Sequence, residues 1–162
     1  MQNSEKTTYI NILIDTLKKK ESVLKKLADA TDRQTVLLDG EFDFEAFDGI
    51  VEEKEKLLEE LEKYDEGFVS LYEKVRDELR DNTAAYAEQV KITQELVRKQ
   101  TELSTGLQAA EERNRSKLTL YLSKGHQKVK EFKASSKTAA AYYRNMSGKH
   151  QDGDSYFFNR KK

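Results

Sequence analysis

The segment from residue 47 to residue 79 repeats apolar residues at alternating spacings of three and four. The residues between them are mostly charged, so a helix here buries only one narrow stripe. The apolar positions are Phe47, Ile50, Leu57, Leu61, Tyr64, Phe68, Leu71, Val75 and Leu79, and only Lys54 interrupts the series. This a/d spacing is typical of a helix packed lengthwise against other helices. It predicts a long helical bundle rather than a thick globular core.

Two further segments carry the same spacing. In residues 4–38 the stripe is Ile10, Leu13, Leu17, Lys20, Leu24, Leu27, Thr31, Gln34 and Leu38. In residues 83–124 it is Tyr86, Val90, Thr93, Val97, Gln100, Leu103, Leu107, Ala110, Asn114, Leu118 and Tyr121, which makes it the most polar of the three. We therefore predict three helices, at residues 4–38, 44–80 and 83–124.

Short polar segments separate these helices. Ser4 is an acceptable N-cap for the first helix, Asp39-Gly40 is a stop, and Asp43 can cap the second helix. Three phenylalanines at residues 42, 44 and 47 are expected to form an apolar plug over one end of the bundle. Asp81-Asn82-Thr83 resembles a turn with a new cap, although no proline or glycine there prevents the second and third helices from fusing into one rod.

The composition favours the same all-α fold. The chain has 162 residues, no proline, 36% hydrophobic residues and 36% charged residues, so burial must come from stripes on long helices. Helices of similar length joined by short turns favour antiparallel neighbours. The prediction is an elongated antiparallel bundle or coiled coil of three long helices, plus a short C-terminal helix or flexible tail.

Charge divides the chain into two parts. Residues 1–123 carry 19 Lys and Arg against 27 Asp and Glu, a net charge of −8, whereas residues 124–162 carry 10 against 3, a net charge of +7. We therefore expect a three-helix body at residues 1–124 and a basic, partly ordered segment at residues 125–162. Such a segment is either an interaction tail or simply a solvated end.

Catalytic, cofactor and metal motifs are not found in the sequence. The two histidines, His126 and His150, fall in the basic segment without partners at metal-ligand or triad spacing, and the chain has no cysteine. Alternating acidic residues near Asp39 lack the twelfth-position Glu of a calcium loop. We expect no enzymatic activity, no cofactor and no metal.

The partners of this chain are expected to be proteins. The acidic body opposes nucleic-acid binding, and the longest apolar run of the N-terminus is too short for a signal peptide or a membrane span. A cytoplasmic location follows most simply. A cationic, aromatic-bearing segment can instead lay an apolar side into a groove of another protein.

Several stretches resemble the FlgN-type flagellar export chaperones. The resemblance covers residues 8–80, with a Leu- and Lys-rich first helix, an acidic turn with phenylalanines, and the segment EEKEKLLEELEKYDEGF at residues 52–68. The ending AAAYYRNMSGKHQDGDSYFFNRKK is similar to the tails of some Gram-positive members.

The resemblance implies a cytoplasmic chaperone of type III flagellar export. Such proteins hold the C-terminal helical segments of hook-associated (hook–filament junction) proteins, prevent their early assembly and deliver them to the export apparatus. The family's client contacts correspond by position to residues 118–146, where the candidates are Leu118, Tyr121, Val129, Phe132, Tyr142, Tyr143 and Met146. We expect a monomer or weak homodimer. The alternatives are a structural or scaffolding coiled coil and a chaperone of the filament cap protein.

Overall fold

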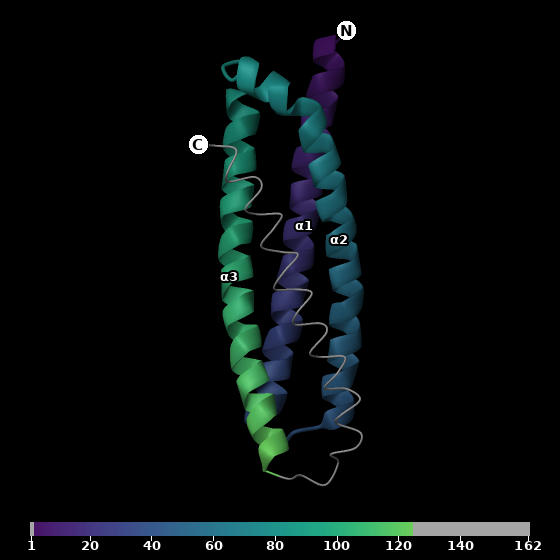
Figure 1. Ribbon diagram of the computed structural model, residues 1–162, viewed down its shortest axis with the longest axis vertical. Coiled ribbons are helices and arrows are strands. Elements are labelled where there is room, and N and C mark those ends of the chain that lie inside the picture. Colours follow the sequence, from purple (N-terminus) through teal and green to yellow (C-terminus); the bar gives the residue numbers. More distant parts are fainter. Residues whose placement is uncertain (1, 125–162) are drawn as a thin grey trace.

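The described residues form three long helices that run antiparallel to their neighbours in sequence (Figure 1). A computed structural model describes residues 2–124. Helix α1 spans Gln2–Asp39, α2 spans Phe44–Asp81 and α3 spans Ala87–Ser123. The described residues contain no strand, so the expected all-α helical bundle is confirmed.

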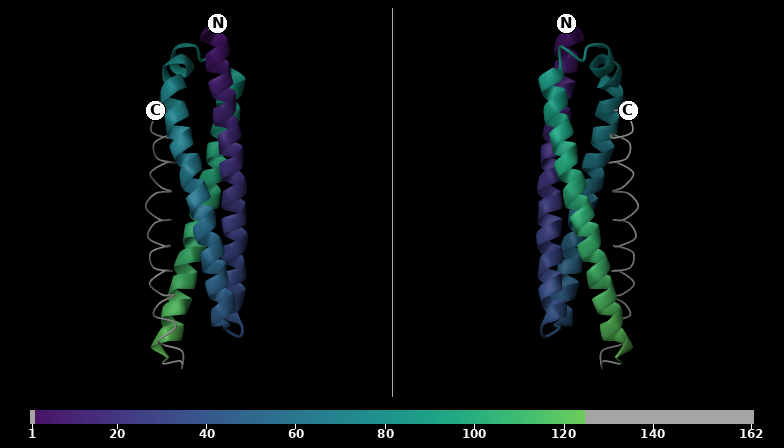
Figure 2. Two further views of the ribbon diagram at one scale, coloured as in Figure 1. Left: turned by 90° about the vertical axis from the view of Figure 1, so that its right-hand side faces the viewer. Right: turned by 90° about the vertical axis from the view of Figure 1, so that its left-hand side faces the viewer.

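Helix α1 is the central element of the bundle. It packs against both α2 and α3, whereas the backbones of α2 and α3 make few close contacts with each other. Figure 2 shows α1 on one side of the molecule, with α2 and α3 diverging along part of their length. Among the described residues, most of the packing between helices therefore involves α1.

The segments between the helices differ from the sequence expectation at two caps. Asp43 accepts a hydrogen bond from the backbone N–H of Ala46 and caps α2 as expected. Helix α1 already begins at Gln2, so Ser4 lies inside it. Thr83 donates its hydroxyl to carbonyls at the end of α2 instead of capping α3, whose N-cap is Tyr86.

A turn at residues 82–86 separates α2 from α3, so the single-rod alternative is wrong. The backbone N–H of Asn82 still bonds the carbonyl of Glu78, and the chain then reverses. The third helix consequently starts at Ala87, four residues later than expected.

Three apolar clusters follow one another along the bundle. The one nearest the N-terminus gathers Leu13, Phe68 and Val97 from the three helices, and the middle one gathers Leu24, Leu61 and Leu107. At the far end, Phe47, Val51 and Leu118 are buried, with Phe42, Phe44 and Tyr121 packed around them. The ring centroids of Phe42 and Tyr121 are 4.6 Å apart. The aromatic plug expected from the sequence is present at this end.

A buried polar layer separates the middle apolar cluster from the plug. Lys54, which interrupts the apolar series in the sequence, belongs to this layer. This side chain does not break the buried stripe, because it is fully buried. Its Nζ donates to Gln34 Oε1 on α1 at 2.7 Å and pairs with Glu111 Oε1 on α3. The polar positions of all three helices thus meet at one level. We call this the central polar layer, and its members are Thr31, Gln34, Lys54, Glu111 and Asn114.

Burial changes the proton affinity of the lysine in this layer. Loss of hydration disfavours the ammonium and lowers the pKa of Lys54 to about 8, although the nearby Glu111 carboxylate partly opposes the shift. A second, smaller polar layer lies between the first two apolar clusters. There Lys20 Nζ is 2.7 Å from Asp65 Oδ1, and Gln100 Nε2 donates to the Leu17 carbonyl at 2.7 Å.

Candidate functional site

The described part of the chain contains no cluster of side chains suited to metal binding. No group of three or more His, Asp or Glu residues in residues 2–124 could hold a metal ion. None of the helices α1 to α3 combines the length and apolar character that crossing a membrane requires. The two histidines of the sequence lie outside the described residues.

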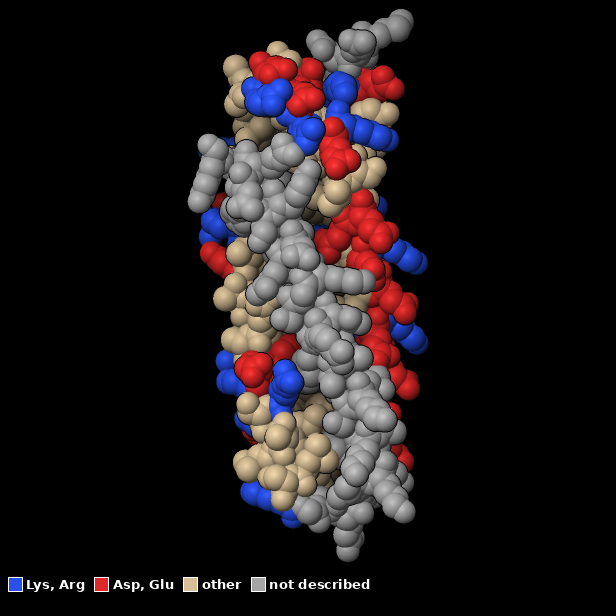
Figure 3. All heavy atoms as spheres, in the orientation of Figure 1, with Lys and Arg blue, Asp and Glu red and all other residues tan. Residues whose placement is uncertain are grey.

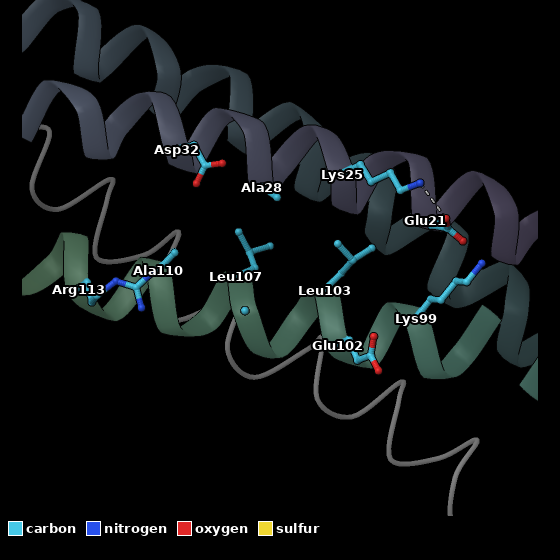
Figure 4. Close-up of a pocket in the computed structure, with 11 residues that line it drawn as sticks. Glu21, Lys25, Ala28, Asp32, Lys99, Glu102, Leu103, Leu107, Ala110 and Arg113 are labelled. Carbon is cyan, nitrogen blue, oxygen red and sulfur yellow. Dashed lines mark ion pairs between the residues drawn. The ribbon is translucent and has the colours of Figure 1, made fainter. Parts of the chain in front are cut away.

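An open groove runs between α1 and α3 (Figure 4). Its volume is about 530 Å³. Leu103 and Leu107 of α3 point across it toward Ala28 of α1, and together they form its apolar floor. Leu107 is buried in the middle apolar cluster, and Leu103 packs partly exposed at its edge. The floor is thus an extension of the core that reaches solvent.

Residues with small side chains leave the space that forms this groove. Gly106 and Ala110 alternate with the two leucines on the same face of α3, and Ala28 is opposite on α1. A Cβ placed on Gly106 would meet no atom of residues 2–124 within 4 Å, so this part of the chain leaves the space above the glycine unfilled. Small side chains let a further helix approach closely, because interaxial distance depends on the side chains at the contact.

Charged side chains of both signs line the rims of the groove. The α1 rim carries Glu21, Lys25 and Asp32, with Lys25 Nζ 3.0 Å from Glu21 Oε1. The α3 rim carries the set Lys99, Glu102 and Arg113. A mixed rim around an apolar floor is the pattern that an amphipathic helix with charged edges can match.

Only two of the predicted client-binding residues lie in the described part of the chain. Leu118 is 6% exposed and packs with Phe47 and Val51 inside the plug. Tyr121 is half-buried beside Phe42. The other candidates, Val129, Phe132, Tyr142, Tyr143 and Met146, lie outside the described residues.

The polar positions of the third stripe do not form an open surface. Thr93, Gln100 and Asn114 are all buried, and Asn114 donates to the Thr31 carbonyl at 3.2 Å. The groove lies instead on the neighbouring flank of α3. Sequence reasoning missed it, although Gly106 and Ala110 within one turn of two leucines are a signal that could have found it.

Comparison with known proteins identifies the family. The FlgN family model, described as FlgN protein, matches residues 1–148, which is most of the chain. No curated protein and no solved structure shows a significant match. A match of this extent agrees with the three-helix bundle described above and with the resemblance seen in residues 8–80. The chain therefore belongs to the FlgN family, a family of flagellar export chaperones.

Proposed function

We propose that this protein is a cytoplasmic chaperone that binds hook-associated proteins, keeps them from assembling early and delivers them to the flagellar export apparatus. It acts by binding and has no catalytic role. The observation that carries the proposal is the α1–α3 groove, whose apolar floor and charged rims fit an amphipathic helix of a client. A client helix seated there completes the three-helix body to four helices.

The basic C-terminal segment supplies the second half of the proposed client surface. Its apolar candidates are Val129, Phe132, Tyr142, Tyr143 and Met146. Leu118 and Tyr121 precede them on α3 and link this segment to the bundle. Because Leu118 is inside the plug, its role is to hold the end of α3 in place, whereas Tyr121 is only half-buried at the edge of the plug and is the better candidate for a client contact.

Filling the groove tests the proposal without removing any native contact. Gly106→Leu places a side chain in the empty space above the glycine, and it also raises helix propensity, so the bundle should stay folded. We expect binding of the C-terminal helical segment of a hook-associated protein to weaken about tenfold or more, which corresponds to about 1.4 kcal/mol of binding free energy. Isothermal titration calorimetry measures the difference.

The matched control is Gly67→Leu, which adds the same side chain in open space on α2, away from the groove. Equal weakening by both variants contradicts the assignment of the groove. A second test deletes residues 126–162 and should abolish capture of the client in a pull-down. Selective binding of a filament cap protein supports the cap-chaperone alternative, and self-association without any client supports a scaffold.

A further inference from the structure

A second surface of the described bundle lies between α2 and α3, on the side away from α1. On α2, Glu53 reaches Arg33 of α1, with 2.7 Å between Glu53 Oε1 and Arg33 Nη2, and Lys54 points into the bundle. Successive helical residues are about 100° apart, so Glu55 lies on the opposite flank of Lys54. That flank faces α3 and solvent instead of α1.

Acidic residues continue along this flank at spacings of four, three, four, three and four. We call this set the acidic stripe, and its members are Asp48, Glu52, Glu55, Glu59, Glu62 and Glu66. Figure 3 shows acidic side chains gathered along α2 in the same view as Figure 1. Partial burial raises the pKa of Glu55, and the nearby charges of Glu52, Asp48 and Glu59 raise it further. The stripe is therefore a surface of concentrated negative potential.

The α3 side of the same face does not balance this charge. Ala110 faces the α1 groove and Glu111 points inward, so the next flank of α3 carries Gln108, Glu112 and Arg115, which together are nearly neutral. Partly exposed apolar groups lie at the inner edge of the face. They are Leu58, four residues after Lys54, and Leu122, four residues after Leu118. A segment with an apolar stripe flanked by cations would therefore be complementary to this face.

Residues 126–146 of this chain have that pattern. They carry five Lys and Arg against one Glu, and Val129, Phe132, Tyr143 and Met146 follow three-four spacing with polar or alanine positions between. The plug places the end of α3 beside the start of α2, since Tyr121 contacts Phe42 just before α2 begins at Phe44 (Figure 1). A segment that follows Ser123 therefore starts next to Asp48.

The length of residues 126–146 also matches the length of the acidic stripe. The acidic stripe covers residues 48–66, about 27 Å along the helix axis, and residues 126–146 span about 30 Å if helical. We propose that residues 126–146 pack against the α2–α3 face as a fourth amphipathic helix, with their lysines along the acidic stripe. The segment then runs antiparallel to α3 and parallel to α2.

The docking of residues 126–146 on α2 does not depend on the proposed function. Its effect on client binding does rest on the proposed function. The docked segment covers the apolar side chains that the proposed function assigns to the client. A client that binds those side chains must first displace the segment from α2. The docking itself is tested in the absence of any client, so its failure and the failure of client binding are separate results.

The test uses the full chain, which contains no cysteine, so a single introduced thiol can be labelled selectively. Thr138→Cys, which lies on the outer side of the segment if it is helical, carries a nitroxide, and paramagnetic broadening of backbone amides is measured by NMR. We expect broadening centred on α2 between residues 52 and 66, with little on the outer side of α1. Raising salt from about 0.02 M to about 0.5 M should reduce it, because screening shortens the electrostatic range to a few ångströms.

Charge variants then test the stripe itself. Glu52→Gln, Glu55→Gln and Glu59→Gln combined should remove most of the broadening at low salt. The matched control, Asp15→Asn, Asp29→Asn and Glu88→Gln combined, changes the net charge equally on other surfaces and should leave it intact. Replacing Lys130, Lys133 and Lys137 by Glu should also release the segment, and reversing the three stripe residues to Lys in that background should restore docking.

Three outcomes overturn the proposal. The first is equal broadening in the stripe variant and in its control. The second is broadening centred on α1 or on the α1–α3 groove. The third appears when isotope-labelled chains without a nitroxide are mixed with spin-labelled, unlabelled chains: broadening in that mixture means that the segment docks on a second copy instead of its own bundle.

Discussion

The ammonium of Lys54 is fully buried and is paired with a carboxylate from another helix. The sequence marks it as a gap between Ile50 and Leu57, because a cation at an a/d position has no obvious partner on its own helix. Its partners come from the other two helices. Glu111 in particular lies one position after Ala110, outside the predicted stripe, so spacing alone could not pair it with Lys54.

Removing one member of this pair should destabilise the bundle strongly. Lys54→Met leaves the Glu111 carboxylate in a buried site without its ammonium partner, and we expect the free energy of unfolding to fall by about 3–5 kcal/mol. Replacing both members, Lys54→Met with Glu111→Leu, should instead be neutral or stabilising by about 1–4 kcal/mol. Urea denaturation followed by circular dichroism measures both. A double variant as unstable as the single variant contradicts this assignment.

The lowered pKa of Lys54 gives the wild-type protein a distinct pH response. Below about pH 8 the lysine is charged in both the folded and the unfolded state. Between about pH 8 and 10.5 the unfolded state binds a proton that the folded state does not bind, so this group makes stability rise with pH. The rise is at most about 1.4 kcal/mol per pH unit.

The double variant lacks this contribution. Its advantage over the wild type at pH 7 should therefore shrink between pH 8 and pH 9.5, because only the wild type gains stability there. Denaturation curves of both proteins at pH 7, 8, 9 and 9.5 measure the difference, and other titrating groups cancel between them. A difference that is constant over this range means that Lys54 does not titrate in the folded state below pH 9.5.

At the scale of the element, the three stripes predicted most of the helices and few of their ends. The bounds of α2 follow closely from Asp43 and from the stripe of residues 47–79, because periodicity and a side-chain cap agree there. The start of α3 was placed four residues early, since Thr83 has the composition of an N-cap but bonds backward to Leu79 and Arg80. Nothing in the sequence gives the direction of that hydroxyl.

Helix α2 contains two glycines that weaken it without any packing function in the described residues. A Cβ on Gly49 or Gly67 meets no atom within 4 Å. Each change to Ala should raise the free energy of unfolding by about 0.5–1 kcal/mol, because Ala restricts the unfolded chain and favours helix. Thermal melting measures the gain. The control is Gly40→Ala, whose Cβ would lie 3.3 Å from the Val36 carbonyl oxygen and should give no gain.

At the scale of the whole molecule, the helical bundle was predicted correctly, but the apolar stripes did not predict which of its surfaces form grooves. Hydrophobic spacing identifies what each helix buries. The candidate contact Leu118 came instead from its position in the family resemblance, and this residue is inside the plug. The α1–α3 groove depends on Ala28 meeting Gly106 and Ala110 from a distant part of the chain. That meeting depends on how the helices are aligned along one another, which the sequence of one chain does not specify.

The central polar layer is the feature that can fix this alignment. Heptad stripes of leucine and valine pack almost equally well after a slip of seven residues, or against a second copy of the chain. Such a slip separates Lys54 from Gln34 and Glu111 and leaves each of them buried in an apolar surrounding, which is costly. Buried polar groups at a/d positions set register and oligomeric state in coiled coils for this reason.

Replacing the central polar layer by apolar residues should therefore raise the free energy of unfolding, but the protein should no longer adopt a single oligomeric state. We expect Gln34→Leu, Lys54→Leu and Glu111→Leu combined to resist urea better than the wild type but to sediment as a mixture of oligomers. The control is Lys54→Gln with Glu111→Gln, which removes the charges but keeps hydrogen-bonding groups in the layer. Analytical ultracentrifugation separates the two results, since the control should remain a single species. If the apolar variant also sediments as one species of the wild-type size, the apolar side chains alone determine the alignment of the three helices.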